Sequence, residues 1–427
     1  MRYINITHPE QGVNFAEALV LGLGQGQGLF FPERLQPFTA IQDLLDMDFV
    51  TRSTAILSYL VGPVMTADDL KDSVSAAFDF PLELEQVSDR VYALELFHGP
   101  SLAFKDFGAR FMAQCLARLG DGKRVTILTA TSGDTGAAVA QAFYAQPGID
   151  VVVLYPKGMV TPLQEKMFCT LGGNIRTIAI EDDFDACQQL VKQSFDDRQL
   201  VEAIGLNSAN SINVARLLAQ VCYYFEAVAQ LPRGTEPVFC VPSGNFGNVT
   251  AGLLAHAIGL PMKRMVAATN RNDTVPRYFH SGKWEPRPTV ATLTNAMDIS
   301  LPNNFPRVLE LGDRHGLPLQ TLLSSVSVSD DETLDAVRML DAKGYLADPH
   351  SALAWKALRD SLDEGETGVF MCTAHPAKFV ETLESALSRP IDLPAELLAV
   401  AEKEVLSAVM PADFDLLRQF LLESQKV

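Results

Sequence analysis

One unit recurs along the middle and C-terminal parts of the chain: an apolar run rich in β-branched residues, a glycine- and serine-rich turn, and an amphipathic stretch. A run that is apolar at every position fits a strand covered on both faces, and helices between such strands imply βαβ crossovers. We therefore predict an α/β fold with two doubly wound, mostly parallel sheets, which bind ligands at the carboxyl ends of their strands. The predicted strands are residues 124–129, 151–155, 175–180, 238–241, 265–268 and 368–372.

The first part of the chain follows a different pattern. Residues 1–95 are rich in helical stretches and loops, with a glycine-rich break at 22–28, and Thr66 followed by Asp68 and Asp69 indicates a helix start. A chain of 427 residues, 48% of them hydrophobic, is long enough for two or three domains. We predict a mainly helical N-terminal domain over 1–95, an α/β domain over 96–230, and a second α/β domain with a helical tail over 231–427.

Charge and cysteine usage exclude several classes of protein. The formal net charge is -18, so nucleic acids and anionic membranes are poor partners, although a small anion in a local pocket is compatible with it. The six cysteines are dispersed, without the spacing of a disulfide framework or a zinc site. No apolar run approaches the roughly 20 residues that span a bilayer, and the N-terminus lacks a signal-peptide pattern. We expect a cytoplasmic, reduced protein without a bound metal.

The segment 97–107 places Lys105 among apolar residues, directly after Leu102, Ala103 and Phe104. Burial lowers the pKa of a lysine and favours the neutral amine, which is the form that makes imines. The alternative is a lysine at a helix start whose ammonium group reaches solvent, and composition alone favours this ordinary role.

Two turns between a strand and a helix have the character of anion sites. In the turn 129–136, backbone N–H groups lie beside the hydroxyls of Ser132 and Thr135; the alternative is a capped turn, with Asp134 or Thr135 as the cap. In the turn 243–248, two glycines allow the backbone to approach a phosphate closely. It is neither a Walker A loop nor a dinucleotide-binding motif. We expect one anionic group at each turn.

Three further segments contain polar residues near predicted strand ends or helix starts. Thr373 follows the apolar run 368–372, and a hydroxyl there can contact a heteroaromatic nitrogen without charging it; the neighbouring His375 and Lys378 have ordinary structural interpretations. The stretch 207–213 concentrates amides and hydroxyls before a helix with Arg216, and residues 347–351 are a weaker case.

Taken in their order along the chain, these segments resemble the motifs of the threonine synthases, in the form found in many bacteria. Residues 15–18 and 28–33 also resemble the N-terminal part of that family, so the resemblance covers nearly the whole chain. The family is similar to the tryptophan synthase β-like enzymes, which bind pyridoxal 5′-phosphate in a type II fold.

The resemblance implies a role for each segment. Lys105 would form the Schiff base with pyridoxal phosphate and move protons during the reaction. Thr373 would face the pyridine nitrogen, and Asp134 would approach the 3′ oxygen. The loop that would bind the cofactor phosphate is Gly244, Asn245, Phe246, Gly247 and Asn248. The turn that would hold the substrate carboxylate is Ser132, Gly133, Asp134, Thr135 and Gly136.

The implied reaction converts O-phospho-L-homoserine and water to L-threonine and phosphate, the last step of threonine biosynthesis. It is a γ-elimination followed by β-addition of water, performed by a carbon–oxygen lyase that acts on a phosphate ester. The leaving phosphate needs cationic or hydrogen-bonding partners, and the sequence does not rank them. The candidates are Ser101, Asn213, Arg216, Lys157 and Lys166.

Other interpretations stay open from sequence. A serine or threonine dehydratase of the same cofactor group would not need the N-terminal domain or a second phosphate site. A binding protein without activity would need neither Lys105 nor Thr373. A kinase or synthetase is disfavoured, because the phosphate-loop lysine and a metal-binding carboxylate cluster are missing. Monomer and homodimer are equally compatible with the sequence.

Overall fold

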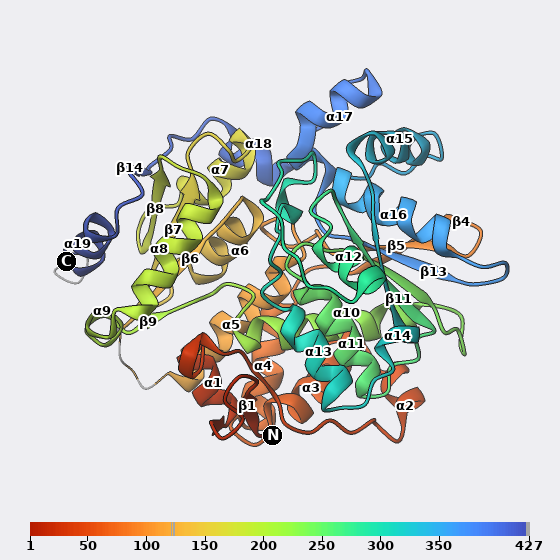
Figure 1. Cartoon of the computed structure of the whole chain (residues 1–427), viewed down its shortest axis with the longest axis horizontal. Coiled ribbons are helices and arrows are strands. Elements are labelled where there is room, and N and C mark those ends of the chain that lie inside the picture. The colour runs from red at the N-terminus through yellow and green to blue at the C-terminus, as the bar shows by residue number, and fades with distance from the viewer. Residues whose placement is uncertain (121, 123, 424–427) are drawn as a thin grey trace.

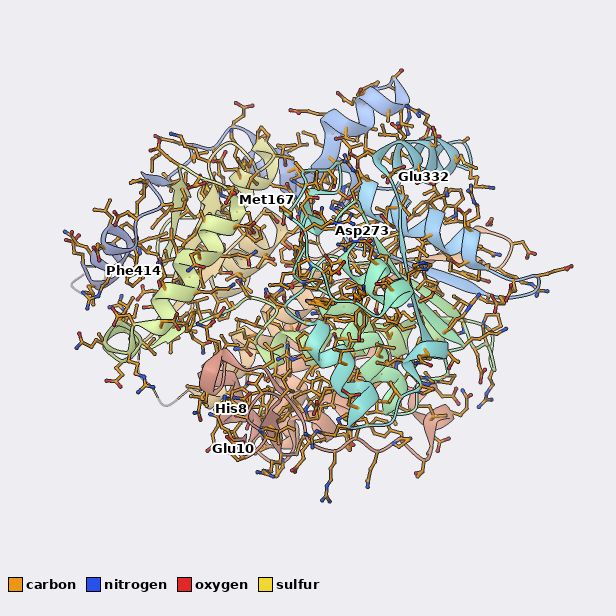
Figure 2. All side chains as sticks on the ribbon, in the orientation of Figure 1. His8, Glu10, Met167, Asp273, Glu332 and Phe414 are labelled. Carbon is orange, nitrogen blue, oxygen red and sulfur yellow. The ribbon has the colours of Figure 1, made fainter. Side chains whose placement is uncertain are left out.

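A computed structural model describes residues 1–120, 122 and 124–423 (Figure 1). The described residues form three sheets, of three, five and six strands. Figure 1 shows the five-stranded sheet on the left, the six-stranded sheet on the right, and the N-terminal elements below them. Side chains fill the spaces between the ribbons, and Met167 is one of the buried ones (Figure 2). None of the helices described is both long and apolar enough to cross a membrane.

The N-terminal elements are mainly helical, as predicted. A small antiparallel sheet in the order β2-β1-β3 packs with four short helices. Thr66 caps one of them by accepting a hydrogen bond from the Asp69 N–H, which confirms the predicted helix start. The elements are β1 (Tyr3–Asn5), β2 (Gly12–Val13), α1 (Phe15–Leu21), η1 (Gln25–Gln27), β3 (Phe30–Pro32), α2 (Ile41–Leu45), α3 (Phe49–Val61) and α4 (Ala67–Ala77).

The five-stranded sheet is parallel throughout, in the order β14-β8-β7-β6-β9. Every residue of β7 is buried, which fits the apolar run 151–155 in a strand covered on both faces. The strands are β6 (Val125–Ala130), β7 (Ile149–Pro156), β8 (Ile175–Ile180), β9 (Leu206–Asn207) and β14 (Ala408–Met410). The helices of this part are α5 (Lys105–Leu119), α6 (Asp134–Phe143), α7 (Pro162–Cys169), α8 (Phe184–Asp196), α9 (Arg198–Ile204), α18 (Ala395–Ala401) and α19 (Phe414–Glu423).

The six-stranded sheet has the order β12-β11-β10-β13-β5-β4 and is parallel except at its β4–β5 edge. The strands are β4 (Glu83–Ser88), β5 (Val91–Glu95), β10 (Val238–Pro242), β11 (Arg264–Thr269), β12 (Leu323–Ser327) and β13 (Gly368–Cys372). The other elements are α10 (Val214–Gln230), α11 (Gly247–Ala257), α12 (Thr274–Ser281), η2 (Asn295–Met297), α13 (Phe305–Asp313), α14 (Leu319–Leu322), α15 (Asp330–Asp341), α16 (Pro349–Ser361), η3 (Pro376–Phe379) and α17 (Val380–Leu387).

The predicted α/β fold class, with parallel sheets and a helical N-terminal part, is confirmed. The predicted domain boundaries stay a prediction, and the sheets divide the chain differently. Residues 83–95 form the β4–β5 hairpin, which joins β13 rather than the N-terminal helices. Residues 408–410 return to the five-stranded sheet as β14. In both cases a strand pairs with another strand that is far away in the sequence, and so it crosses a predicted domain boundary.

The carboxyl ends of β6, β10 and β13 lead into the turns that the sequence singled out. Residues 131–135 follow β6, residues 243–248 follow β10, and Thr373 follows β13. In Figure 1, α5 and α10 lie between the two larger sheets, and Lys105 is the first residue of α5. The fold therefore brings three strand ends and one helix start to the same region.

Candidate active site

A cavity of about 120 Å³ lies where the strand ends meet. Its walls come from the turns after β6, β10 and β13, the start of α5, the segment 207–216, and the segment 296–303 that faces the turn after β10. Many of the residues that line it have polar side chains, which distinguishes the cavity from a packing defect in the apolar core. The predicted site residues that line it are Lys105, Ser132, Asp134, Thr135, Arg216, Gly244, Asn245, Phe246, Gly247, Asn248 and Thr373.

The backbone before Lys105 is fastened to the backbone after β13. Phe104 N–H donates to the carbonyl of Thr373 at 3.0 Å, and His375 N–H donates to the carbonyl of Leu102 at 3.0 Å. Leu102 has a φ of 55°, a left-handed conformation that is unfavourable for a leucine and is held here by these bonds. The two strands of this short bridge carry Lys105 and Thr373 into the same cavity.

The Lys105 ammonium group is largely buried. Burial lowers its pKa from 10.5 to about 8, with the nearby Asp134 opposing the shift and Lys378 and Arg216 adding to it. The Nζ atom lies 3.9 Å from Oδ2 of Asp134. The predicted burial of Lys105 is therefore present, and a substantial fraction of the amine is neutral near pH 8.

Asp134 begins α6 and is buried beside two lysines. Its Oδ1 lies 2.5 Å from Nζ of Lys378 and accepts a hydrogen bond from Nε2 of Gln164 at 2.9 Å. Burial alone would raise the pKa of this carboxyl, but Lys378 and Lys105 outweigh it and hold the pKa well below its usual range. The Lys378 ammonium is fully enclosed and also donates to the carbonyl of Ser101. No sequence pattern indicated this contact.

The N-terminus of α6 is capped by neither of the residues that the sequence offered. Instead, Oγ1 of Thr131 accepts the N–H groups of Gly133 and Gly136, at 2.9 and 2.8 Å. Gly133 has a φ of 139°, which only glycine adopts readily, and a Cβ there would strike Gln164. Gly133 does not line the cavity, whereas Ser132 and Thr135 do.

The turn after β10 fits a phosphate group. Phe246 has a φ of 59°, and α11 begins at Gly247 without a side-chain cap, so the first turn of the helix presents its N–H groups to the cavity. A Cβ on Gly244 would lie 2.7 Å from the Cα of Met297. Asn248 accepts hydrogen bonds from the hydroxyls of Tyr223 and Tyr224, while its buried Nδ2 has no partner among the described residues.

Arg216 supplies a buried cation on another wall of the cavity. Burial lowers its pKa to about 10, and Asp106 opposes the shift. One guanidinium nitrogen donates to the carbonyl of Ala209, whereas the buried Nε has no partner within the described chain. Asn210 and Ser211 line the cavity beside it. This cluster is a second place where an anion can bind.

The remaining candidates for the leaving phosphate do not line the cavity. Asn213 caps α10 and donates to the carbonyl of Leu19, and Ser101 is buried behind Lys378. Lys157 pairs with Glu181 at the surface, and Lys166 donates to the carbonyl of Ala401. Spacing alone did not reveal which polar side chains of these segments face inward.

Comparisons with known proteins identify the family. The model for pyridoxal-phosphate dependent enzymes matches residues 79–374, and models for the N terminus and the C-terminal part of threonine synthase match residues 2–78 and 351–421. Threonine synthase from Haemophilus influenzae is 59% identical over 427 residues, covering 99% of this chain and 100% of that protein.

Solved structures agree with this result. Threonine synthase from Escherichia coli is 56% identical, with a TM-score of 0.97 and full coverage of both chains. The PLP-bound threonine synthase from Brucella melitensis is 32% identical, with a TM-score of 0.92 and full coverage of both chains. The resemblance inferred from the sequence and the predicted cofactor are confirmed. The chain belongs to the threonine synthase family of pyridoxal-phosphate dependent enzymes.

Proposed function

We propose that this chain converts O-phospho-L-homoserine and water to L-threonine and phosphate, with Lys105 as its cofactor-binding lysine. The observation that carries the proposal is the set of residues that line one cavity. It combines a buried lysine whose pKa is about 8 with two separate anion sites, at the α11 N-terminus and at Arg216. A reaction that needs both a phosphorylated cofactor and a phosphorylated substrate requires this combination.

The residues fit pyridoxal phosphate. When bound, the cofactor supplies an electron sink that acidifies the α carbon of an amino acid. The loop 244–248 would hold its phosphate through the N–H groups of α11, and the Thr373 hydroxyl would meet the pyridine nitrogen. We propose Asp134 as the neighbour of the 3′ oxygen. Because Lys378 keeps Asp134 ionised, the carboxylate accepts rather than donates, and Lys378 supplies the balancing positive charge.

Lys105 is the proposed base for the α proton. With cofactor and substrate bound, the Lys105 amine would lie at the reacting carbon, where it would take up the α proton. Its pKa of about 8 suits both the removal and the return of a proton near neutral pH. The low pKa arises mainly from burial, so exclusion of water from the cavity is part of the mechanism.

The two ends of the substrate would bind at different walls. The turn of Ser132, Gly133, Asp134 and Thr135 would hold the carboxylate, with the hydroxyls of Ser132 and Thr135 as the groups that line the cavity. Arg216, with Asn210 and Ser211, would hold the leaving phosphate. Asn213 donates to the carbonyl of Leu19, and Ser101 does not line the cavity, so we propose that they support these walls from behind.

We also propose that the enzyme is cytoplasmic, acts on this small-molecule substrate as a monomer or homodimer, and uses no nucleic-acid partner. The net charge of -18 supports the last point, because such a surface repels phosphate backbones.

The experiment that tests the function is direct. Purified protein supplied with phosphohomoserine should release threonine and phosphate in equal amounts. Faster deamination of serine or threonine than turnover of phosphohomoserine would overturn the proposal. Lys105→Ala should abolish the bound chromophore that borohydride reduces in the wild type, while Lys166→Ala, outside the cavity, should keep it.

A further inference from the structure

His350 lines the cavity that contains Lys105 and has an unpartnered ring nitrogen. It is the second residue of α16, its side chain is 3% exposed, and it lines the cavity. Its Nδ1 lies 2.7 Å from Oδ2 of the fully buried Asp348. Its Nε2 is buried and makes no hydrogen bond to any described residue. Buried polar atoms nearly always have a partner, so a free nitrogen on a cavity wall points to a ligand.

Asp348 fixes the orientation of the imidazole. Its Oδ2 also accepts the backbone N–H of His350 at 3.0 Å, and its Oδ1 accepts the N–H of Ser351 at 3.1 Å. An ionised carboxylate only accepts hydrogen bonds, so Nδ1 carries the hydrogen that it receives. In the neutral ring Nε2 is then an acceptor, and with a second proton it becomes a donor. The arrangement resembles the way a carboxylate orients a catalytic histidine.

The position of His350 indicates which ligand it faces. Helix α16 packs against β13, the strand that Thr373 directly follows. His350, Asp134 and Thr373 all line the same cavity. The histidine therefore shares the cavity with the two residues that we propose for the pyridine nitrogen and the 3′ oxygen.

We propose that His350 is a cofactor contact, whose Nε2 hydrogen-bonds the pyridoxal phosphate on the side that faces Thr373 and Asp134, with Asp348 holding the ring in place. This inference rests on the proposed function, because it requires the cofactor in this cavity. The contact restrains the cofactor ring and places a polar atom beside it. Losing the contact should change both the affinity of the cofactor and its absorbance.

The test compares His350→Phe, which keeps a ring of similar size without a polar atom, with His350→Gln, which keeps an amide. The control is His256→Gln, because His256 binds the carbonyl of Leu260 and does not line the cavity. Each apo protein is titrated with pyridoxal phosphate, and the dissociation constant and absorbance maximum of the bound cofactor are recorded. Urea unfolding of each apo protein shows that it is folded.

We expect His350→Phe to weaken cofactor binding about tenfold, the typical cost of one buried hydrogen bond, and to shift the absorbance maximum. His350→Gln should recover much of both effects, and His256→Gln should match the wild type. A folded His350→Phe protein with wild-type affinity and absorbance would overturn the inference, even if its KM rose, since His350 would then contact substrate. A wild type that forms no reducible chromophore would instead overturn the proposed function.

Discussion

Nζ of Lys378 lies 2.5 Å from Oδ1 of Asp134, with both side chains excluded from solvent. Lys105 lies on the other side of the same carboxylate, 3.9 Å from Oδ2. One buried negative charge thus stands between two ammonium groups. Lys105 is consumed as a free amine when it binds a carbonyl compound, whereas Lys378 keeps its ammonium group. Lys378 is therefore the permanent counter-ion of Asp134.

Lys378→Met should destabilise the apo protein strongly, because it leaves Asp134 buried with only the more distant Lys105 as a cationic partner. We expect a loss of about 3 kcal/mol in the free energy of unfolding, the lower end for breaking a buried ion pair. Urea unfolding of the apo protein measures it. Adding Asp134→Asn to Lys378→Met should recover most of the loss, since the unpaired charge is then removed.

Lys157→Met is the matched control for that experiment. Lys157 pairs with Glu181 at 2.9 Å, but both side chains are about half exposed. Solvent screens such a pair, so its loss should cost less than about 1 kcal/mol. If Lys378→Met cost no more than Lys157→Met, the buried pair would not have the electrostatic importance that we assign to it.

The pKa of about 8 for Lys105 predicts how cofactor capture depends on pH. Only the neutral amine attacks the aldehyde, so the rate of covalent binding to apo protein should rise with pH and level off above about pH 8. Below that value, the neutral fraction falls about tenfold per pH unit. Asp134 opposes the lowering of this pKa, so Asp134→Asn should move the midpoint to lower pH.

Stopped-flow absorbance after mixing apo protein with pyridoxal phosphate at a series of pH values measures this dependence. An unperturbed lysine, with a pKa of 10.5, would still gain about tenfold in rate between pH 8 and pH 9. Such a gain would show that Lys105 is not buried in the way the structure indicates.

The contrast between Lys105 and Lys378 shows what could be predicted from sequence. Strands covered on both faces leave an apolar signature, and parallel topology brings strand ends together, so Thr373 and the turn 243–248 were placed at strand ends in advance. Lys105 was joined to them by the resemblance of its segment to a family motif. Lys378 reaches Asp134 only because the turn after β13 folds back onto α6. Likewise, Thr131 rather than Asp134 satisfies the start of α6. Such side-chain directions depend on tertiary packing and leave no periodic pattern.

Substitution by alanine should change the stability of the protein differently at the two glycines of the turn 243–248. A Cβ on Gly244 would lie 2.7 Å from the backbone of Met297, whereas one on Gly247 would come no closer than 3.4 Å, to the side chain of Asn304. Gly244→Ala should therefore displace the segment around Met297 and cost about 1–3 kcal/mol in unfolding free energy, as overpacking does. Gly247→Ala should stay close to the wild type in the same urea experiment.

The cofactor then distinguishes packing from ligand contact at these two glycines. If the loop holds the cofactor phosphate, Gly247→Ala should weaken binding of pyridoxal phosphate despite its intact stability, because a methyl group would stand at the start of α11. Wild-type cofactor affinity in Gly247→Ala would contradict close approach of the phosphate at that residue.

Arg216 and Asn213 lie three residues apart, but their substitution should affect different properties: substrate binding for Arg216 and stability for Asn213. The buried Nε of Arg216 has no partner among the described residues, whereas Asn213 caps α10 and binds the carbonyl of Leu19. Arg216→Gln should raise the KM for phosphohomoserine roughly tenfold to a hundredfold, the cost of a charge-assisted hydrogen bond. Its cofactor affinity should change little, because the cofactor phosphate is assigned to the turn 243–248.

Asn213→Ala should instead lower the unfolding free energy by about 1 kcal/mol, as loss of a cap does, with KM near that of the wild type. Steady-state kinetics and urea unfolding of both variants make the comparison. An unchanged KM in Arg216→Gln would exclude Arg216 as the phosphate partner, and a raised KM in a stable Asn213→Ala would place Asn213 at the substrate.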